Sequence, residues 1–282
     1  MKTFYHEMIW KVIKIKLLFI AFFLVCCTTK PDDRFKHVDW DEVKSSYITL
    51  TTTKQDITLH LGGNTPIKIL WGEERITKDI LDTLLRDWYA DDWWLPEFGP
   101  FSIEYNHTFR NVESNVIVIY GNITSLNANN NCISKIETEN MESLKSLYIS
   151  DNLLTTIDVR KNINIRELYL FMNKISHIVL CENPLLRSLD LSQNKLTSLS
   201  LCLNQSMQTI RIDNNEFTDY EINKLFLSLH DLRPYYFFEK SIFIANNPGT
   251  YTSNANIALD KGWRVVDSGE GFISFRFNTE EE

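Results

Sequence analysis

Asparagines in the middle of the 282-residue chain recur at a constant spacing of 21 residues. The series comprises Asn131, Asn152, Asn173, Asn194 and Asn215. Around each asparagine the apolar residues keep one register, as in Leu144-x-x-Leu147-x-Ile149-x-x-Asn152-x-Leu154. A fixed period of this length indicates a repeat protein, in which each repeat buries its apolar residues against its neighbours and cannot stand alone.

This register resembles that of leucine-rich repeats, and the resemblance is strongest over residues 123–217. Alternation in Leu168-Tyr169-Leu170 predicts a short strand whose leucines point inward. The resemblance implies a solenoid with parallel strands on its concave face. The expected fold class is mainly β: a solenoid of 21-residue leucine-rich repeats preceded by a small antiparallel β-sandwich.

The repeated asparagine stands where the chain leaves the strand and turns. We expect its side-chain amide to be buried and to bond backbone groups of its own repeat and of the neighbouring one. An unpaired polar group there would cost about 1–3 kcal/mol, so the series would fix the register of the stack. Asn162, Asn183 and Asn204 keep the same 21-residue spacing after the turn.

Residues 122–217 form the predicted repeats, and residues 218–282 form the predicted C-terminal cap. Thr218 would begin a helix, and a further strand-and-asparagine pattern ends at Asn247. One or two helical turns are expected at 254–260, and a closing strand at 272–277. The Asn-Pro-Gly turn at 247–249 and the Lys-Gly-Trp at 261–263 resemble the ends of many bacterial leucine-rich-repeat surface proteins.

Residues 46–121 show period-two alternation and tight turns, which predict a separate small β-sandwich. The order Trp71-Gly72, then His107-Thr108-Phe109, then an apolar strand at 116–119 resembles the PKD-type immunoglobulin-like domain. A helical aromatic insertion is predicted at 77–100. Within it Trp88, Trp93 and Trp94 lie near two carboxylates and suggest a glycan site, or else their rings pack against the sandwich or the first repeat.

The N-terminus has the pattern of a secretory signal. Four lysines precede nine uninterrupted apolar residues at 17–25, which are too few to cross a bilayer, since a helix needs roughly 20. The apolar run ends in Leu24-Val25-Cys26-Cys27, which resembles a bacterial lipobox with Cys27 (or Cys26) as the acylated residue. We expect a lipoprotein signal at 1–26 and a linker at 27–45, with an uncleaved N-terminal anchor as the alternative. The flanking acidic residues resemble those of lipoproteins sent to the outer-membrane surface of Gram-negative bacteria.

Composition limits the classes of function. A formal net charge of −8 argues against binding to nucleic acid, which requires a basic face. The sequence contains no nucleophile elbow, zinc-protease motif, phosphate loop or dinucleotide fingerprint. No histidine has a partner at metal-ligand spacing. The expectation is therefore a monomer that is not an enzyme and has no catalytic residue, cofactor or metal.

The residues between the buried strand leucines would point outward from the concave face. On neighbouring strands they bring together Tyr148, Tyr169, Phe171, Asp190 and Arg211. Tyrosine and arginine are enriched where proteins bind one another, so this patch is the predicted surface for a protein or peptide partner. Cys181 and Cys202 are 21 residues apart and near enough in such a stack for a disulfide, although free or partly buried thiols are the favoured alternative.

The resemblance to leucine-rich-repeat adhesins and internalin-like proteins implies a cell-surface binding or adhesion function. The open alternative is a glycan-binding surface lipoprotein that uses the aromatic segment 88–98. A hydrolase is the least favoured class, since it would need paired carboxylates in a cleft.

Overall fold

The computed structural model describes residues 45–63, 67–72, 103–110, 113–201, 204–231 and 240–268. All of them belong to one compact unit, Asp41–Glu282. The predicted signal sequence, most of the predicted linker, the insertion at 77–100 and the closing strand at 272–277 lie outside the described residues.

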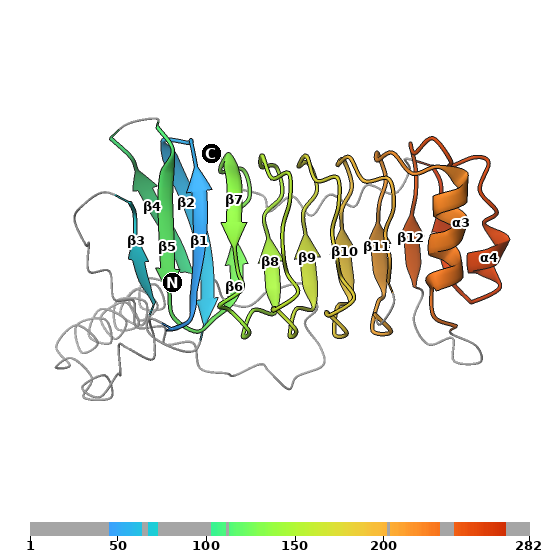
Figure 1. The fold of residues 1–282 in the computed structure, drawn as a ribbon, viewed down its shortest axis with the longest axis horizontal. Helices are drawn as coiled ribbons and strands as arrows, with labels where there is room; N and C mark the ends of the chain where they lie inside the picture. The colour runs from blue at the N-terminus through green and yellow to red at the C-terminus, as the bar shows by residue number, and fades with distance from the viewer. Residues whose placement is uncertain are drawn as a thin grey trace, which may run out of the picture. The chain divides into compact units, whose positions relative to one another are not determined.

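The N-terminal part consists of five antiparallel strands in two layers (Figure 1). Strands β1 (Tyr47–Thr52), β3 (Lys68–Leu70) and β5 (Asn115–Tyr120) form one layer, and β2 (Asp56–Gly63) and β4 (Ile103–Thr108) form the other. Apolar residues alternate along these strands and are buried between the layers, as period-two burial in β1 and β2 shows. The predicted antiparallel β-structure is therefore present.

The repeats form a ladder of parallel strands, which confirms the predicted solenoid. The ladder runs from β6 (Ile123–Asn127) through β8 (Ser146–Tyr148), β9 (Glu167–Tyr169), β10 (Ser188–Asp190), β11 (Thr209–Arg211) and β12 (Ser241–Phe243) to β13 (Arg264–Val266). From β6 to β11 the paired residues are 21 apart, so Leu147 lies beside Leu126 and Leu168 beside Leu147. These leucines are fully buried, because each repeat covers the apolar edge of the one before it.

The sandwich and the solenoid share both of their sheets. Strand β2 pairs with the first repeat strand β6, and β1 pairs with β7 (Ile133–Glu137), which follows the first turn. The predicted boundary at 121/122 falls between β5 and β6, and each sheet continues across it. These antiparallel pairs cover the first repeat, so the sandwich caps a solenoid end that would otherwise expose apolar side chains.

Each repeated asparagine lies in a buried ladder of amides, with exposed fractions of 8% or less at Asn131, Asn152, Asn173, Asn194, Asn215 and Asn247. The Asn173 Nδ2 group donates to the carbonyl oxygens of Leu170, in its own repeat, and Ile149, in the preceding one, both at 3.0 Å. Its Oδ1 accepts from the Leu154 N–H at 3.0 Å. Each amide thus connects two turns of the solenoid.

The first amide of this ladder bonds the sandwich instead of a preceding repeat. Asn131 donates from Nδ2 to the Thr58 carbonyl at 2.7 Å and accepts from the Thr58 N–H at 3.2 Å. Thr58 lies in β2, so a sandwich strand supplies the backbone groups that a repeat supplies elsewhere. The asparagine pattern is continuous with the N-terminal cap.

The residue before each ladder asparagine has a left-handed backbone, with φ between 53° and 59° at Asn130, Asp151, Met172, Gln193, Asn214 and Asn246. This conformation reverses the chain and directs the next side chain inward. Asparagine and aspartate tolerate it best among non-glycine residues, and β-branched residues tolerate it poorly. None of the six positions holds a β-branched residue.

A second ladder follows the turn and is also buried. Asn162, Asn183 and Asn204 each donate from Nδ2 to carbonyl groups of the preceding repeat, at 2.7–3.0 Å. The Thr138 hydroxyl also donates to Asn162 Oδ1 at 2.7 Å. The residues equivalent to Thr138 are apolar in the next two repeats, Val159 and Leu180. The Oδ1 atoms of Asn183 and Asn204 are therefore buried without a hydrogen-bond partner. The Asn162 side chain therefore forms one more hydrogen bond than the side chains of Asn183 and Asn204.

The C-terminal cap begins at α3 (Asp219–Ser228), where the Thr218 side chain accepts from the Glu221 N–H as predicted for a helix start. Gly249 approaches the backbone there so closely that a Cβ atom would lie 2.0 Å from the Asp219 nitrogen. A short helix, α4 (Asn256–Leu259), follows. Trp263 is 1% exposed and donates from Nε1 to the His230 carbonyl at 3.0 Å. The cap therefore closes on a buried aromatic ring.

Replacement of Asn173 by alanine is expected to lower the free energy of unfolding by about 2–4 kcal/mol, because carbonyl and N–H groups of two repeats lose their partners. Urea unfolding followed by circular dichroism measures this change. The control is Asn164→Ala in the preceding repeat, where a single exposed bond to the Glu142 carbonyl is lost and the cost should stay below about 1 kcal/mol. Equal costs for the two variants would contradict the structural role of the ladder.

Candidate functional site

The concave face is the outward side of β8–β12, and its side chains stand in three columns. The first column is Ser146, Glu167, Ser188, Thr209 and Ser241; the second is Tyr148, Tyr169, Asp190, Arg211 and Phe243; the third is Ser150, Phe171, Ser192, Asp213 and Ala245. Residues of one column lie side by side because the strands pair in register, at intervals of 21 residues from β8 to β11 and of 32 residues from β11 to β12. The predicted site residues lie in the second and third columns.

Two tyrosines form a stack at one end of this face. The rings of Tyr148 and Tyr169 are nearly parallel, with centroids 5.0 Å apart and an interplanar angle of 19°. Phe171 follows Tyr169 in the third column and is half-buried. The Tyr148 hydroxyl donates to Glu167 Oε2, a first-column residue that the sequence prediction did not include. Burial and the adjacent Glu167 carboxylate raise the pKa of Tyr148, so its hydroxyl stays protonated at neutral pH.

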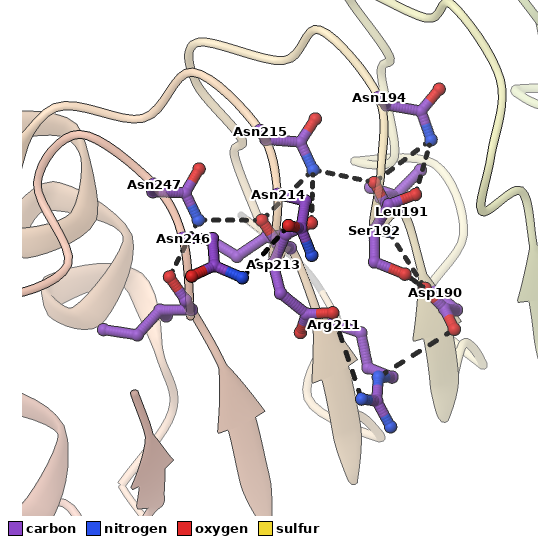
Figure 2. Close-up of polar contacts among 12 residues, drawn as sticks. Asp190, Leu191, Ser192, Asn194, Arg211, Asp213, Asn214, Asn215, Asn246 and Asn247 are labelled. Carbon is purple, nitrogen blue, oxygen red and sulfur yellow. Dashed lines mark hydrogen bonds and ion pairs between the residues drawn. The ribbon is translucent and has the colours of Figure 1, made fainter. Parts of the chain in front are cut away.

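Next to the tyrosines, one guanidinium lies between two carboxylates (Figure 2). Arg211 Nε is 3.9 Å from Asp190 Oδ2, and Arg211 Nη2 is 3.9 Å from Asp213 Oδ2. The guanidinium carbon also lies 4.2 Å from the centroid of the Phe243 ring, in a cation–π contact. The Arg211 side chain is only 16% exposed, so its position is set by the fold.

Asp190 is held by hydrogen bonds from its own turn. Its Oδ1 accepts from the Ser192 N–H at 2.9 Å and from the Ser192 hydroxyl. Burial raises the pKa of Asp190, while the Ser192 bonds and Arg211 oppose that shift. This carboxylate therefore has specific partners in the structure.

Asp213 is less well satisfied. It is 4% exposed, and its Oδ1 is buried without a hydrogen-bond partner. Burial raises the pKa of Asp213 to about 6; Arg211 lowers it and Asp190 raises it. The Ser150 hydroxyl, in the same column, is also buried and unpartnered. The sequence prediction did not select Asp213. The available signal was its position two residues after Arg211, in the neighbouring column.

The structure does not describe every predicted site residue. Trp88, Trp93, Trp94, Cys26, Cys27 and Cys202 lie outside the described residues, so the glycan and lipidation sites stay predictions from the sequence. Cys181 is disulfide-bonded, so the favoured expectation of a free thiol is wrong for this residue. Cys132, the other described cysteine, is free.

Within residues 45–268, apart from the gaps given above, no three or more His, Cys, Asp or Glu side chains are placed to hold a metal ion. Over the same residues, no helix has both the length and the apolar character that a membrane span requires.

The fold defines the class of this protein as a leucine-rich-repeat solenoid with an antiparallel N-terminal cap. No protein-family model matches the sequence, and no curated protein matches it either.

Three solved structures with local similarity come from Listeria monocytogenes. The functional domain of InlJ, described as including a cysteine ladder, is 24% identical with a TM-score of 0.37, covering 44% of this chain and 25% of that one. An internalin, InlF, is 19% identical with a TM-score of 0.33, over 44% of this chain and 42% of the other. Internalin C2 is 17% identical with a TM-score of 0.32, over 52% of this chain and 81% of the other. The fold assignment rests on the strands and amide ladders of this chain.

The raised pKa of Asp213 makes a prediction about stability and pH. Because the folded pKa of about 6 exceeds the ordinary value of 3.8, the folded state holds the proton more tightly, and this contribution is lost as the pH rises between those values. Asp213→Asn should therefore be more stable than the parent at pH 7, by about 1–3 kcal/mol, and the difference should vanish below about pH 4.

Urea unfolding of both proteins between pH 4 and pH 8 tests this expectation. Asp158→Asn is the control, because hydrogen bonds from Arg160 lower the pKa of exposed Asp158 and its removal should cost stability at neutral pH instead. A difference between parent and Asp213→Asn that does not vary with pH would refute the assignment.

Proposed function

We propose that this chain is a cell-surface binding protein whose concave face recognises a protein or peptide partner. The observation that carries the proposal is the Tyr148–Tyr169 stack beside the Asp190–Arg211–Asp213 cluster on one fixed sheet. Aromatic and arginine side chains dominate the binding energy of many protein interfaces. The proposal assigns no catalytic activity and no cofactor to the chain.

Preorganisation supports a binding role for this patch. Arg211 is held by two carboxylates and the Phe243 ring, and Tyr148 is held by its neighbour ring and by Glu167. Side chains that are already ordered lose little conformational freedom when a partner binds, which lowers the entropic cost of association. The amide ladders hold the strands beneath them in fixed register.

The proposal includes a place in the cell, supported by sequence alone. The basic and apolar leader with Leu24-Val25-Cys26-Cys27 supports export and acylation at Cys27. The chain would then be a monomeric lipoprotein on the outer-membrane surface of a Gram-negative bacterium. The PKD-like resemblance of residues 46–121 fits such a protein, in which the sandwich separates the repeats from the membrane anchor.

The double substitution Tyr148→Ala/Tyr169→Ala is expected to weaken capture of the natural partner at least about tenfold, since it removes the stacked aromatic rings of the proposed surface. The test displays the full chain on cells of its source, cross-links it, and quantifies captured proteins by mass spectrometry. Tyr220→Ala/Tyr251→Ala is the matched control, because these tyrosines are 70% and 80% exposed in the cap. Both variants should keep the parent melting temperature within a few degrees, and undiminished capture by the first variant would reject the proposed surface.

Lipidation is tested by metabolic labelling with a palmitate analogue. Cys27→Ala should abolish labelling, whereas Cys26→Ala should preserve it, because only the cysteine after the cut becomes the new N-terminal residue and carries the lipid on its thiol. Protease treatment of intact cells then reports whether the chain is displayed outside. If Cys27→Ala stays labelled and Cys26→Ala loses the label, the acylated residue is Cys26. If both variants stay labelled, the lipobox assignment is wrong.

A further inference from the structure

Three carboxylates cross the concave face on one diagonal. Glu167, Asp190 and Asp213 are separated by 23 residues at each step, two more than the repeat. Each step therefore moves one strand across and two residues along. Strands lie about 4.8 Å apart and two residues span about 6.7 Å, so neighbouring members of the diagonal are about 8 Å apart.

The charge on this face is unbalanced. Among the residues of the three columns, three are carboxylates and one, Arg211, is a cation, which leaves a formal charge of 1 − 3 = −2. Arg211 lies 3.9 Å from both Asp190 and Asp213, farther than the roughly 2.7–2.9 Å of a direct charge-assisted hydrogen bond. Arg211 thus contacts two carboxylates at long range. The third carboxylate, Glu167, accepts a hydrogen bond from the neutral Tyr148 hydroxyl.

A second observation shows that the diagonal lacks a donor. Asp213 is 4% exposed and its Oδ1 has no hydrogen-bond partner, although its carboxylate lies beside Arg211 (Figure 2). A desolvated acceptor without a partner costs about 1–3 kcal/mol. On the β12 side the adjacent residues are Phe243 and Ala245, which offer no side-chain donor. A cationic side chain of a partner, placed over Asp190 and Asp213, would offset the excess negative charge of this face.

We propose that the partner is a basic, extended peptide segment that crosses the strands along this diagonal. Lysine or arginine side chains of the segment pair with Glu167, Asp190 and Asp213, and an apolar or aromatic side chain packs on the Tyr148–Tyr169 stack. In an extended segment, alternate residues point to the same side at intervals of about 6.7 Å, and long basic side chains cover the remaining distance to carboxylates about 8 Å apart. This inference rests on the proposed binding function and specifies its partner.

The experiment selects a randomised library of 12-residue phage-displayed peptides on the full chain. Peptides captured by the parent should contain lysine and arginine at least about threefold more often than the unselected library. Their affinity for Asp190→Asn/Asp213→Asn should fall about tenfold or more, because the near-isosteric amides remove the charge. Glu142→Gln/Glu182→Gln removes two exposed carboxylates from turns away from the concave face and should change affinity less than about twofold.

Salt gives a second readout that needs no variant. Binding of the selected peptides to the parent should weaken about fivefold or more between 50 and 300 mM salt, since screening acts on ion pairs. This measurement also decides the question if the double aspartate variant fails to fold, which its melting curve would show.

The outcomes separate this inference from the proposed function. Peptides that require Tyr148 and Tyr169 but are neither basic nor salt-sensitive would overturn the basic partner and leave the binding surface intact. Peptides captured equally by Tyr148→Ala/Tyr169→Ala would overturn the binding surface itself. A library from which the parent captures nothing above an uncoated surface would count against both.

Discussion

The bond between a buried asparagine amide and the backbone of the preceding repeat is the interaction on which this structure depends. A single 21-residue turn buries too few side chains to offset the entropy of ordering its backbone. Stacking brings in apolar burial, but leucines alone would permit a stack to slip. The Asn173 amide accepts from Leu154 and donates to Ile149, so a displaced repeat would leave several buried polar groups without partners. Burial supplies the driving force, and the amides supply the register.

The ends of the stack follow from the same constraint. At the N-terminal end, Thr58 of β2 gives Asn131 the backbone groups that a preceding repeat would give. At the C-terminal end, Asn247 still accepts from the Phe217 N–H, and beyond it the packing of α3, α4 and Trp263 closes the apolar interior. The antiparallel sandwich and the helical cap are unlike in structure, yet both satisfy polar groups and cover apolar ones.

The rigid ladder also explains how the concave face keeps a poorly satisfied carboxylate. Asp213 is buried with an unpartnered oxygen, which in a pliable structure would be relieved by rotation of the backbone. Here Asp213 lies two residues beyond β11, a strand that pairs with neighbours on both sides. The next residue, Asn214, has the left-handed backbone that leads to Asn215. A site that binds charge commonly costs stability in the free protein, and this geometry fits that pattern.

The sequence by itself determined the solenoid, because the same apolar register and the same asparagine recur every 21 residues, so each repeat forms the same turn. It also determined which side chains face outward, since strand alternation assigns Tyr148, Tyr169 and Arg211 to the concave face. The tertiary structure decided the rest: that β1 and β2 continue the sheets of the first repeat, that Cys181 is disulfide-bonded, and that Asp213 lacks a partner. Those features depend on distances between segments far apart in the chain and on which atoms exclude water, and no periodic pattern of residue types encodes either of them.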